Sequence, residues 1–470
     1  MVADEGAYYF QASTIRIEGL RGFRKLADQY VADPVQQGLP APNRVGHIVL
    51  ASIALRARDS MRALSVLSLA CFAATAILIF AFAWTHWNPL TAAVAGVLAA
   101  FSPLGVGLSR RALMDTDYAL FTVLALVLCV RWMTTARGSA LVAFASALFA
   151  ALMVKETVWL FMPFFVITPI VAGLAAGRRV PFAHIALIAC GVPLAAIGVS
   201  MALLGPGRFV EIVRVSAQLN AVTPNPYLVA YGSGPWYEYL ISLLLLSPIV
   251  GLLFLLFAGA YAGRGEWHAP TTVVLTFFAY ALAALALLPK NPRLILPLDV
   301  AVRIGAAAAI VWAVRRAHAF GRPFALAVGG ALMGAAIVSD AASFERYFAR
   351  LDVYDPVTFA LLQREHMAPP SANWGTEKLA DEYVELSLAF SQVRDFAGAI
   401  RAGRSALLWR PNDAMAYRTI GAAYCEMQQW RDAVQALEAA LRIDPASPGA
   451  AGARANLARA RVALASSKSP

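Results

Sequence analysis

The chain has 470 residues, of which 60% are hydrophobic and 14% charged, and its formal net charge is +11. Soluble domains are roughly one half apolar and one quarter charged, so this composition excludes an ordinary soluble enzyme and predicts a polytopic membrane protein. The basic residues are scattered between apolar runs, which argues against nucleic acid as a partner and favours lipid headgroups and phosphorylated lipids. The four cysteines form no close pair, so neither a disulfide framework nor a cysteine metal site is predicted.

Residues 1–60 form the first segment, which is acidic and aromatic at its start and then basic. Asp4 and Glu5 precede Tyr8, Tyr9 and Phe10, and no apolar core of a cleavable signal peptide follows them. The apolar run 45–55 is too short to cross about 30 Å of hydrocarbon, so it predicts an interfacial helix.

A series of about ten apolar segments then predicts a transmembrane helical bundle. Several of them contain proline, which neighbouring helices tolerate. Loop arginines gather on one side, which predicts the cytoplasm there and, more weakly, both termini outside. The segments are 61–83, 90–108, 117–133, 139–153, 158–175, 182–204, 238–262, 271–288, 294–313 and 322–340, and the loop arginines are Arg137, Arg178, Arg179, Arg264, Arg315, Arg316 and Arg322.

The longest loop between these segments covers residues 205–237 and falls on the predicted outer side. Glycine and proline punctuate it, and Tyr231, Trp236 and Tyr237 supply aromatic surface. A loop of this kind is typical of function rather than of a linker, so we expect it to contact substrate.

After about residue 340 the pattern becomes soluble and amphipathic, with a repeat of period 34 that is typical of tetratricopeptide helical hairpins. Two repeats and a final helix make a small array, which is expected either to dock a partner protein or to act as a structural cap. The matched positions are Ala389/Ala423, Phe390/Tyr424, Phe396/Trp430, Ala399/Ala433, Ala406/Ala440, Leu407/Leu441 and Pro411/Pro445.

Charged residues at three short outer segments are the candidates for a chemical role. Arg110 and Arg111 stand beside Asp115 and Asp117 at a span boundary, where ionisable residues are functional candidates. Snorkelling arginines and a helix-capping aspartate would also explain this cluster. Asp115 and Asp117 have the spacing of a metal-binding pair, which by itself is a weak signal for a divalent cation.

Lys155, next to Glu156, interrupts two apolar runs, and Lys290 with Arg293 forms another short outer loop. Singly, each is explained by a wetted turn or an interfacial anchor. Together with Arg110 and Arg111 they present cations to one membrane face, as a phosphate clamp requires. The six histidines are scattered, and no nucleotide-binding loop or catalytic triad is indicated.

With these residues in view, the chain resembles the integral membrane glycosyltransferases of the GT-C type, in particular the group of dolichyl-phosphate-mannose–protein mannosyltransferases and lipid A aminoarabinose transferases. The resemblance covers roughly residues 1–340. It rests on Asp4-Glu5, Ser109-Arg110 through Leu113-Met-Asp115, Lys155-Glu-Thr157, Gly234-Pro-Trp-Tyr237 and Asn291-Pro-Arg293 through Pro297.

The resemblance implies a sugar donor on a polyprenyl phosphate at the outer membrane face. It implies that Asp4 is the general base toward the acceptor hydroxyl, assisted by Glu5, and that Asp115 is the second catalytic acid. Arg110, Arg111, Lys155, Lys290 and Arg293 then correspond to the donor-phosphate site. Such a reaction requires no cofactor in principle, with a divalent cation as the alternative.

Two features depart from the family. The stretch Leu39-Pro-Ala-Pro-Asn43 lacks the histidine of the His-Pro-Pro-like sequence at that place, which affects the expected substrate class. The family also has a helix ahead of the acidic pair, so we expect a missing N-terminal helix of about 20 apolar residues encoded upstream of Met1, with an impaired form of the enzyme as the alternative.

The sequence thus predicts an all-α protein: a GT-C-like membrane domain (1–340), an amphipathic connector (341–376) and a tetratricopeptide domain (377–465). The predicted function is a hexosyl- or pentosyltransferase of the cytoplasmic membrane, acting at the extracytoplasmic face on a protein, lipid or glycan acceptor. The alternatives are a lipid-linked-glycan transporter and a non-catalytic scaffold. A transporter is expected to show internal repeats and charges within its spans, and the sequence indicates neither, because the charges cluster at one face.

Overall fold

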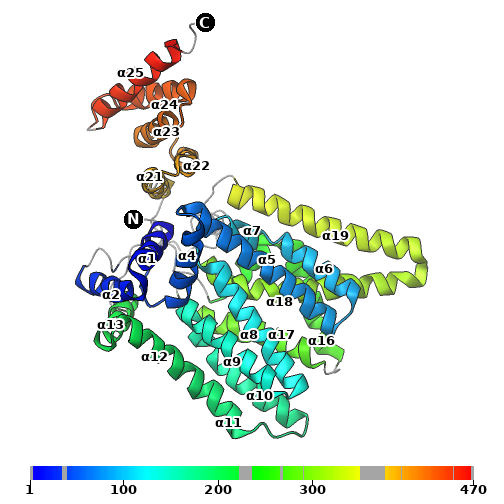
Figure 1. Cartoon of the computed structure of the whole chain (residues 1–470). Coiled ribbons are helices and arrows are strands. Elements are labelled where there is room, and N and C mark those ends of the chain that lie inside the picture. The colour runs from blue at the N-terminus through cyan, green and yellow to red at the C-terminus, as the bar shows by residue number, and fades with distance from the viewer. Residues whose placement is uncertain are drawn as a thin grey trace. The chain divides into compact units, whose positions relative to one another are not determined.

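The chain folds as an all-α protein in two compact units, residues 8–345 and residues 346–470 together with the first seven. The computed structural model describes residues 4–33, 37, 40–221, 236–264, 268–288, 291–349, 376–392, 394–447 and 449–466. No strand occurs within those ranges. The positions of the two units relative to one another are not determined (Figure 1).

Short helices open the larger unit before the first span. The predicted interfacial helix is present as α4, and α1, α4 and α5 share an apolar cluster that includes Ala12, Ala51 and Leu64. The segment predicted as a first outer loop is therefore largely helical. Its elements are α1 (Asp4–Glu18), η1 (Gly19–Arg21), α2 (Gly22–Ala32) and α4 (Val45–Ala57).

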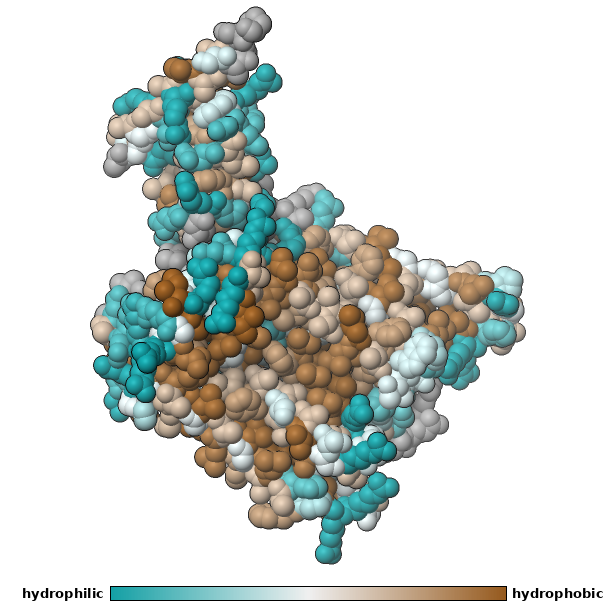
Figure 2. Space-filling model, viewed as in Figure 1, coloured by the Kyte–Doolittle hydropathy of each residue, from teal (hydrophilic) through white to brown (hydrophobic). Residues whose placement is uncertain are grey.

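The rest of the larger unit is a bundle of apolar helices, and it makes the chain a multi-pass membrane protein. Seven described helices are long and apolar enough to cross a membrane, or nine if each of two bent pairs counts as one span. Figure 2 shows hydrophobic residues gathered in a broad band over the middle of this bundle. In order, the elements are α5 (Met61–His86), α6 (Pro89–Ala100), α7 (Pro103–Ser109), α8 (Asp115–Thr135), α9 (Gly138–Val154), η2 (Glu156–Phe161), α10 (Met162–Ala175), α11 (Phe182–Ala186), η3 (Leu187–Gly191), α12 (Val192–Leu204), α13 (Pro206–Ala221), α15 (Glu238–Leu246), α16 (Pro248–Arg264), α17 (Ala269–Ala286), η4 (Pro292–Ile295), α18 (Leu296–Ala317), η5 (His318–Phe320) and α19 (Arg322–Phe344), and η6 (Glu345–Ala349) starts at the last residue of this unit.

The ten predicted spans correspond to these helices with two differences. The segment predicted at 139–153 is α9, which has 17 residues and is shorter than the other candidate spans. Two segments predicted as single spans are bent, by 52° between α6 and α7 and by 120° between α15 and α16. The residues at both bends are a serine followed by a proline, Ser102-Pro103 and Ser247-Pro248. Proline supplies no backbone N–H and disfavours a helical residue before it, so a helix breaks at this pair.

A buried cluster of charged side chains contacts the serine at each of the two bends. Arg303 of α18 donates from Nε to Asp299 Oδ1 at 3.0 Å, from its terminal nitrogens to Ser247 Oγ at 2.6 Å, and to Asp340 of α19. Ser102 Oγ donates to the second Asp299 oxygen at 2.5 Å and also caps α7. The expectation that no charges lie within the spans is therefore wrong. Pairing among these side chains, together with their hydrogen bonds, offsets part of the desolvation cost of burying them.

The smaller unit is a stack of antiparallel helices whose boundaries repeat every 34 residues. Helices end at Gln392 and Glu426 and begin at Phe396 and Trp430. Ala399 and Ala433 are fully buried where the helices cross, in a core to which Phe396 and Trp430 contribute. The elements are α21 (Thr376–Gln392), α22 (Phe396–Trp409), α23 (Ala414–Glu426), α24 (Trp430–Ile443) and α25 (Ala450–Ser466). Most of the predicted connector, residues 350–375, lies outside the described residues.

Candidate functional site

The candidate site is built around Asp115, the first residue of α8. Its carboxylate is 1% exposed and stands in the first helical turn, where backbone N–H groups favour negative charge. The turn before it is tied to α5, since Ser68 Oγ donates to the Leu113 carbonyl at 2.8 Å. Local backbone structure thus fixes the position of this carboxylate.

Lys155 supplies the strongest contact to Asp115. It lies between α9 and η2, it is buried, and its Nζ donates to Asp115 Oδ1 at 2.7 Å. The same ammonium lies 4.8 Å from the ring centre of Tyr118. Burial lowers the pKa of Lys155, and the negative charge of Asp115 opposes that shift.

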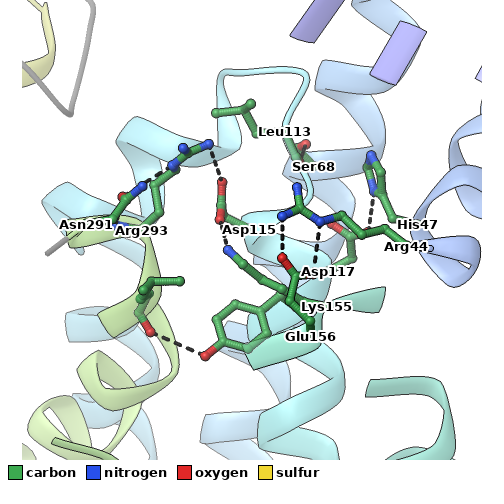
Figure 3. A network of polar contacts seen from close by, with 12 residues as sticks. Arg44, His47, Ser68, Leu113, Asp115, Asp117, Lys155, Glu156, Asn291 and Arg293 are labelled. Carbon is green, nitrogen blue, oxygen red and sulfur yellow. Dashed lines mark hydrogen bonds and ion pairs between the residues drawn. The ribbon is translucent and has the colours of Figure 1, made fainter. Parts of the chain in front are cut away.

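Arg293 approaches Asp115 from the other side (Figure 3). Asn291 shapes its loop by accepting hydrogen bonds from the Arg293 backbone at 3.0 Å and from Arg293 Nε at 3.3 Å. The Asn291 N–H in turn donates to the Tyr239 hydroxyl at 3.0 Å. A terminal nitrogen of Arg293 lies 3.9 Å from Asp115 Oδ2, an oxygen that has no hydrogen bond within the described part of the chain. This contact is longer than a hydrogen bond and leaves room for a closer partner.

Arg44, just before α4, adds a third cation. It donates to both carboxylate oxygens of Glu156, at 3.0 Å through Nε, and also to the Tyr8 hydroxyl. Helix α4 can come this close because Gly46 faces the Met153 backbone, where a Cβ would lie only 2.9 Å from the Met153 carbonyl carbon. A fork pairing of this kind holds the guanidinium plane in one orientation.

His47 and Asp117 form another buried pair in the network. His47 Nδ1 lies 2.7 Å from Asp117 Oδ2, and the imidazole is edge-on to the Tyr8 ring, with centroids 4.6 Å apart. His47 Nε2 has no hydrogen-bond partner among the residues that the structure describes. Asp117 therefore holds one imidazole nitrogen and leaves the other available.

Of the residues predicted from the sequence, Asp115, Lys155 and Arg293 come together. Arg110 lies with its guanidinium 5.4 Å from the Phe344 ring centre, and Arg111 is buried. The predicted residues Lys290 and Tyr231 lie outside the described residues. The side chains of Trp236 and Tyr237 are 72% and 43% exposed, with ring centroids 5.6 Å apart.

Asp4 and Glu5 are the first two residues of α1, and Glu5 is buried. They belong to the smaller unit, and the position of that unit relative to the bundle is not determined. Their assignment to the same site as Asp115 stays a prediction.

Sequence reasoning missed Arg44 and His47, and it treated Glu156 only as part of a charged turn. Arg44 contacts a residue 112 positions away and His47 one 70 positions away, so no local pattern pairs them. A local signal did exist for the cluster inside the spans, because Asp299 and Arg303 are four residues apart in an apolar run and so share a helix face.

For the metal-binding alternative, the described residues place no third His, Cys, Asp or Glu side chain in one group with both Asp115 and Asp117. The two carboxylates contact different partners, Lys155 and His47. Within the described ranges, no three His, Cys, Asp or Glu side chains come together in a way that could hold an ion.

Comparison of the chain with models of known protein families finds no match, and comparison with curated proteins finds none either.

Proposed function

We propose that this protein is an integral membrane glycosyltransferase that moves a sugar from a polyprenyl phosphate to a protein, lipid or glycan acceptor. One observation carries the proposal: Lys155 and Arg293 converge on Asp115 from loops far apart in the sequence, at one end of a membrane bundle. Arginine and lysine together stabilise a departing phosphate, the first through paired hydrogen bonds and the second as a point charge.

Without donor, the cations of this network are balanced by carboxylates. Asp115 neutralises Lys155, and Glu156 neutralises Arg44. The contact between Arg293 and Asp115 is longer than these two, at 3.9 Å, and the Arg293 side chain is 12% exposed. A donor phosphate replaces this long contact, and Arg293 moves toward it.

In the proposed reaction, a base takes the proton of the acceptor hydroxyl, whose oxygen forms a bond to the sugar C1. The bond from C1 to the phosphate oxygen breaks, and polyprenyl phosphate leaves with the electron pair. Lys155 and Arg293 stabilise the charge on that leaving group. The base assigned by resemblance is Asp4, with Glu5 in support, and the exposed rings of Trp236 and Tyr237 offer apolar faces to a sugar.

The proposed location is the bacterial cytoplasmic membrane, with the site on the extracytoplasmic side. The smaller unit is proposed to be a tetratricopeptide domain that docks a protein partner. Its 34-residue helical period supports this assignment.

A transporter of lipid-linked glycans is the second candidate. Two bent spans and the buried Asp299–Arg303–Asp340 cluster favour it, since discontinuous helices and charges at membrane depth occur in transporters.

The test is a proteoliposome assay with radiolabelled polyprenyl-phosphate sugars, comparing wild type with Asp4→Asn and Arg293→Ala. Arg137→Ala is the matched control, because Arg137 is exposed just before α9, at the end opposite Lys155. We expect transfer to fall by about 10²–10³-fold in both variants and to persist in the control.

Unchanged transfer in Asp4→Asn would remove Asp4 as the base, and unchanged transfer in Arg293→Ala would remove the phosphate site. Passage of labelled donor between leaflets without transfer to any acceptor would favour the transporter. Neither passage nor transfer would favour a scaffold.

A further inference from the structure

A cavity of about 430 Å³ lies at the other end of the bundle from Asp115. It is lined by the last turns of α8, the end of α10, the loop that follows and the first turns of α17. Helix α8 has 21 residues, which places its end about 30 Å from Asp115, close to the thickness of a membrane core. Figure 1 shows this end of α10 beside α11, away from α4 and α7. The cavity has the size of a small-molecule site and belongs to the opposite membrane face.

Two consecutive arginines stand at this cavity. Arg178 and Arg179 are exposed, and within the described ranges neither guanidinium has a hydrogen bond or ion pair. Their turn is well defined, since Gly177 takes φ +64° and the Arg178 N–H donates to the Gly173 carbonyl at 2.8 Å. A glycine in the left-handed region ends α10 and directs the chain around the cavity.

The walls combine apolar surface with one buried polar atom. Trp132, Pro169 and Val273 line the cavity. His184 also lines it, with its ring 6.0 Å from that of Trp132, and its buried Nδ1 has no hydrogen-bond partner among described residues. A ligand here meets positive charge at the mouth, a polar nitrogen and an apolar wall.

We propose that this cavity binds the phosphate headgroup of an anionic lipid, with the phosphate held by Arg178 and Arg179 and a lipid chain against Trp132 and Val273. Guanidinium groups bind phosphate through paired, charge-assisted hydrogen bonds. Basic pockets between transmembrane helices are a known form of headgroup site. The lipid is a glycerophospholipid or a polyprenyl phosphate, which share this chemistry, and the proposal is independent of the sugar-transfer reaction.

Native mass spectrometry of the full chain in detergent tests this site with dioleoyl phosphatidylglycerol, dioleoyl phosphatidylcholine and undecaprenyl phosphate as probes. We expect wild type to retain one anionic lipid in preference to phosphatidylcholine. The variant Arg178→Ala/Arg179→Ala removes both guanidiniums and should retain it at least about tenfold less, since the loss of even one charge-assisted hydrogen bond corresponds to about that factor.

Two further variants separate a built site from surface attraction. Arg315→Ala/Arg316→Ala removes an exposed arginine pair at the end of α18 that does not line the cavity, and it should leave retention unchanged. Val273→Trp fills the cavity, keeps both arginines and should lower retention as much as their removal. Thermal unfolding of each variant checks that it is folded.

Equal losses from the two arginine pairs, or undiminished retention in Val273→Trp, would overturn the proposal. Displacement of the lipid by inorganic phosphate at equal concentration would also overturn it, because a soluble ion would then be the ligand. Competition between phosphatidylglycerol and undecaprenyl phosphate identifies the source, and preference for either over phosphatidylcholine supports the site.

Discussion

Two polar networks in the same bundle contain similar charged residues but differ in how far their side chains are exposed. Around Arg303, the guanidinium contacts two carboxylates and a serine, and the three ionised side chains are at most 8% exposed. Around Asp115, the arginines are 12% and 17% exposed, and Glu156 is 48% exposed. The first network is almost fully buried, and the second is partly exposed.

Hydrogen bonding does not separate the two networks as clearly, because Asp340 Oδ1 of the Arg303 cluster is also buried without a hydrogen bond among the described residues. Both oxygens of Asp299 are bonded, and the cluster holds the serines of the two bent spans. In the other network, Asp115 Oδ2 and His47 Nε2 lack hydrogen bonds within the described residues. Charge at membrane depth therefore does not by itself indicate a binding site. Exposure distinguishes the candidate site from the structural cluster, whereas both contain buried polar atoms without hydrogen bonds among the described residues.

Arg303→Met should give the largest loss of stability. It leaves Asp299 and Asp340 buried without their cation, which costs about 3–5 kcal/mol. Thermal unfolding in detergent measures the change. The triple variant Asp299→Asn/Arg303→Met/Asp340→Asn is the control, since it removes the charges together and should recover much of the loss. A triple variant no more stable than Arg303→Met would contradict the view that unpaired charge is the cause.

The Arg303 cluster also shows which parts of the fold can be predicted from the sequence. The helical bundle and the 34-residue helical period follow from apolar run lengths and repeated small residues, both of which are local patterns. Asp299 and Arg303 are a local pattern as well, and their spacing inside an apolar run predicts a paired face. The third charge, Asp340, is 37 residues away from Arg303 and could not be assigned to the pair.

In the candidate site, the sequence could identify residue types but not partners. Lys155 and Arg293 interrupt apolar runs, so each was visible as a charged loop. That Asp115 lies between them depends on how three separate helices pack, which one sequence does not contain. His47 looked like an isolated histidine because its partner, Asp117, is 70 residues away.

Lys155→Met should have the next largest effect. Among the described residues, Asp115 then keeps only the contact to Arg293 at 3.9 Å. We expect about 2–3 kcal/mol of destabilisation, less than for Arg303→Met because Arg293 can move toward the carboxylate. Lys25→Met is the matched control, since Lys25 is half exposed and pairs with Glu18 at the surface. A loss equal to that of Arg303→Met would show that both networks are equally closed.

Ser102→Ala tests whether the Arg303 cluster acts through the bent spans. The change removes the hydrogen bond to Asp299 and the cap of α7, for which we expect about 1–2 kcal/mol in thermal unfolding. Ser109→Ala is the control in the same helix, because Ser109 Oγ donates to the backbone carbonyl three residues earlier. Equal losses from the two changes would show that the hydrogen bond from Ser102 to the Arg303 cluster does not stabilise the bend between α6 and α7.

Asp59 belongs to an exposed ion pair, and its substitution should have the smallest effect on stability. It accepts a hydrogen bond from the Tyr9 hydroxyl at 2.7 Å and pairs with Arg16 at 2.6 Å, with its side chain 47% exposed. The hydrogen bond from Tyr9, and then Arg16, hold the pKa of Asp59 below its usual 3.8. A lowered carboxylate pKa contributes stability above the unfolded pKa, and that contribution is lost as pH falls through the folded pKa.

Asp59→Asn should therefore lower the thermal midpoint slightly at pH 6, by an amount that solvent screening keeps small. The difference from wild type should shrink below about pH 4, where the unfolded carboxyl is protonated. Tyr9→Phe removes the main cause of the lowered pKa and should show the same trend with a smaller gap. A difference in thermal midpoint that stays constant down to pH 3 would show that the Asp59→Asn variant loses packing rather than charge. The exposed Asp59–Arg16 pair would then contribute no electrostatic stability, unlike the buried networks.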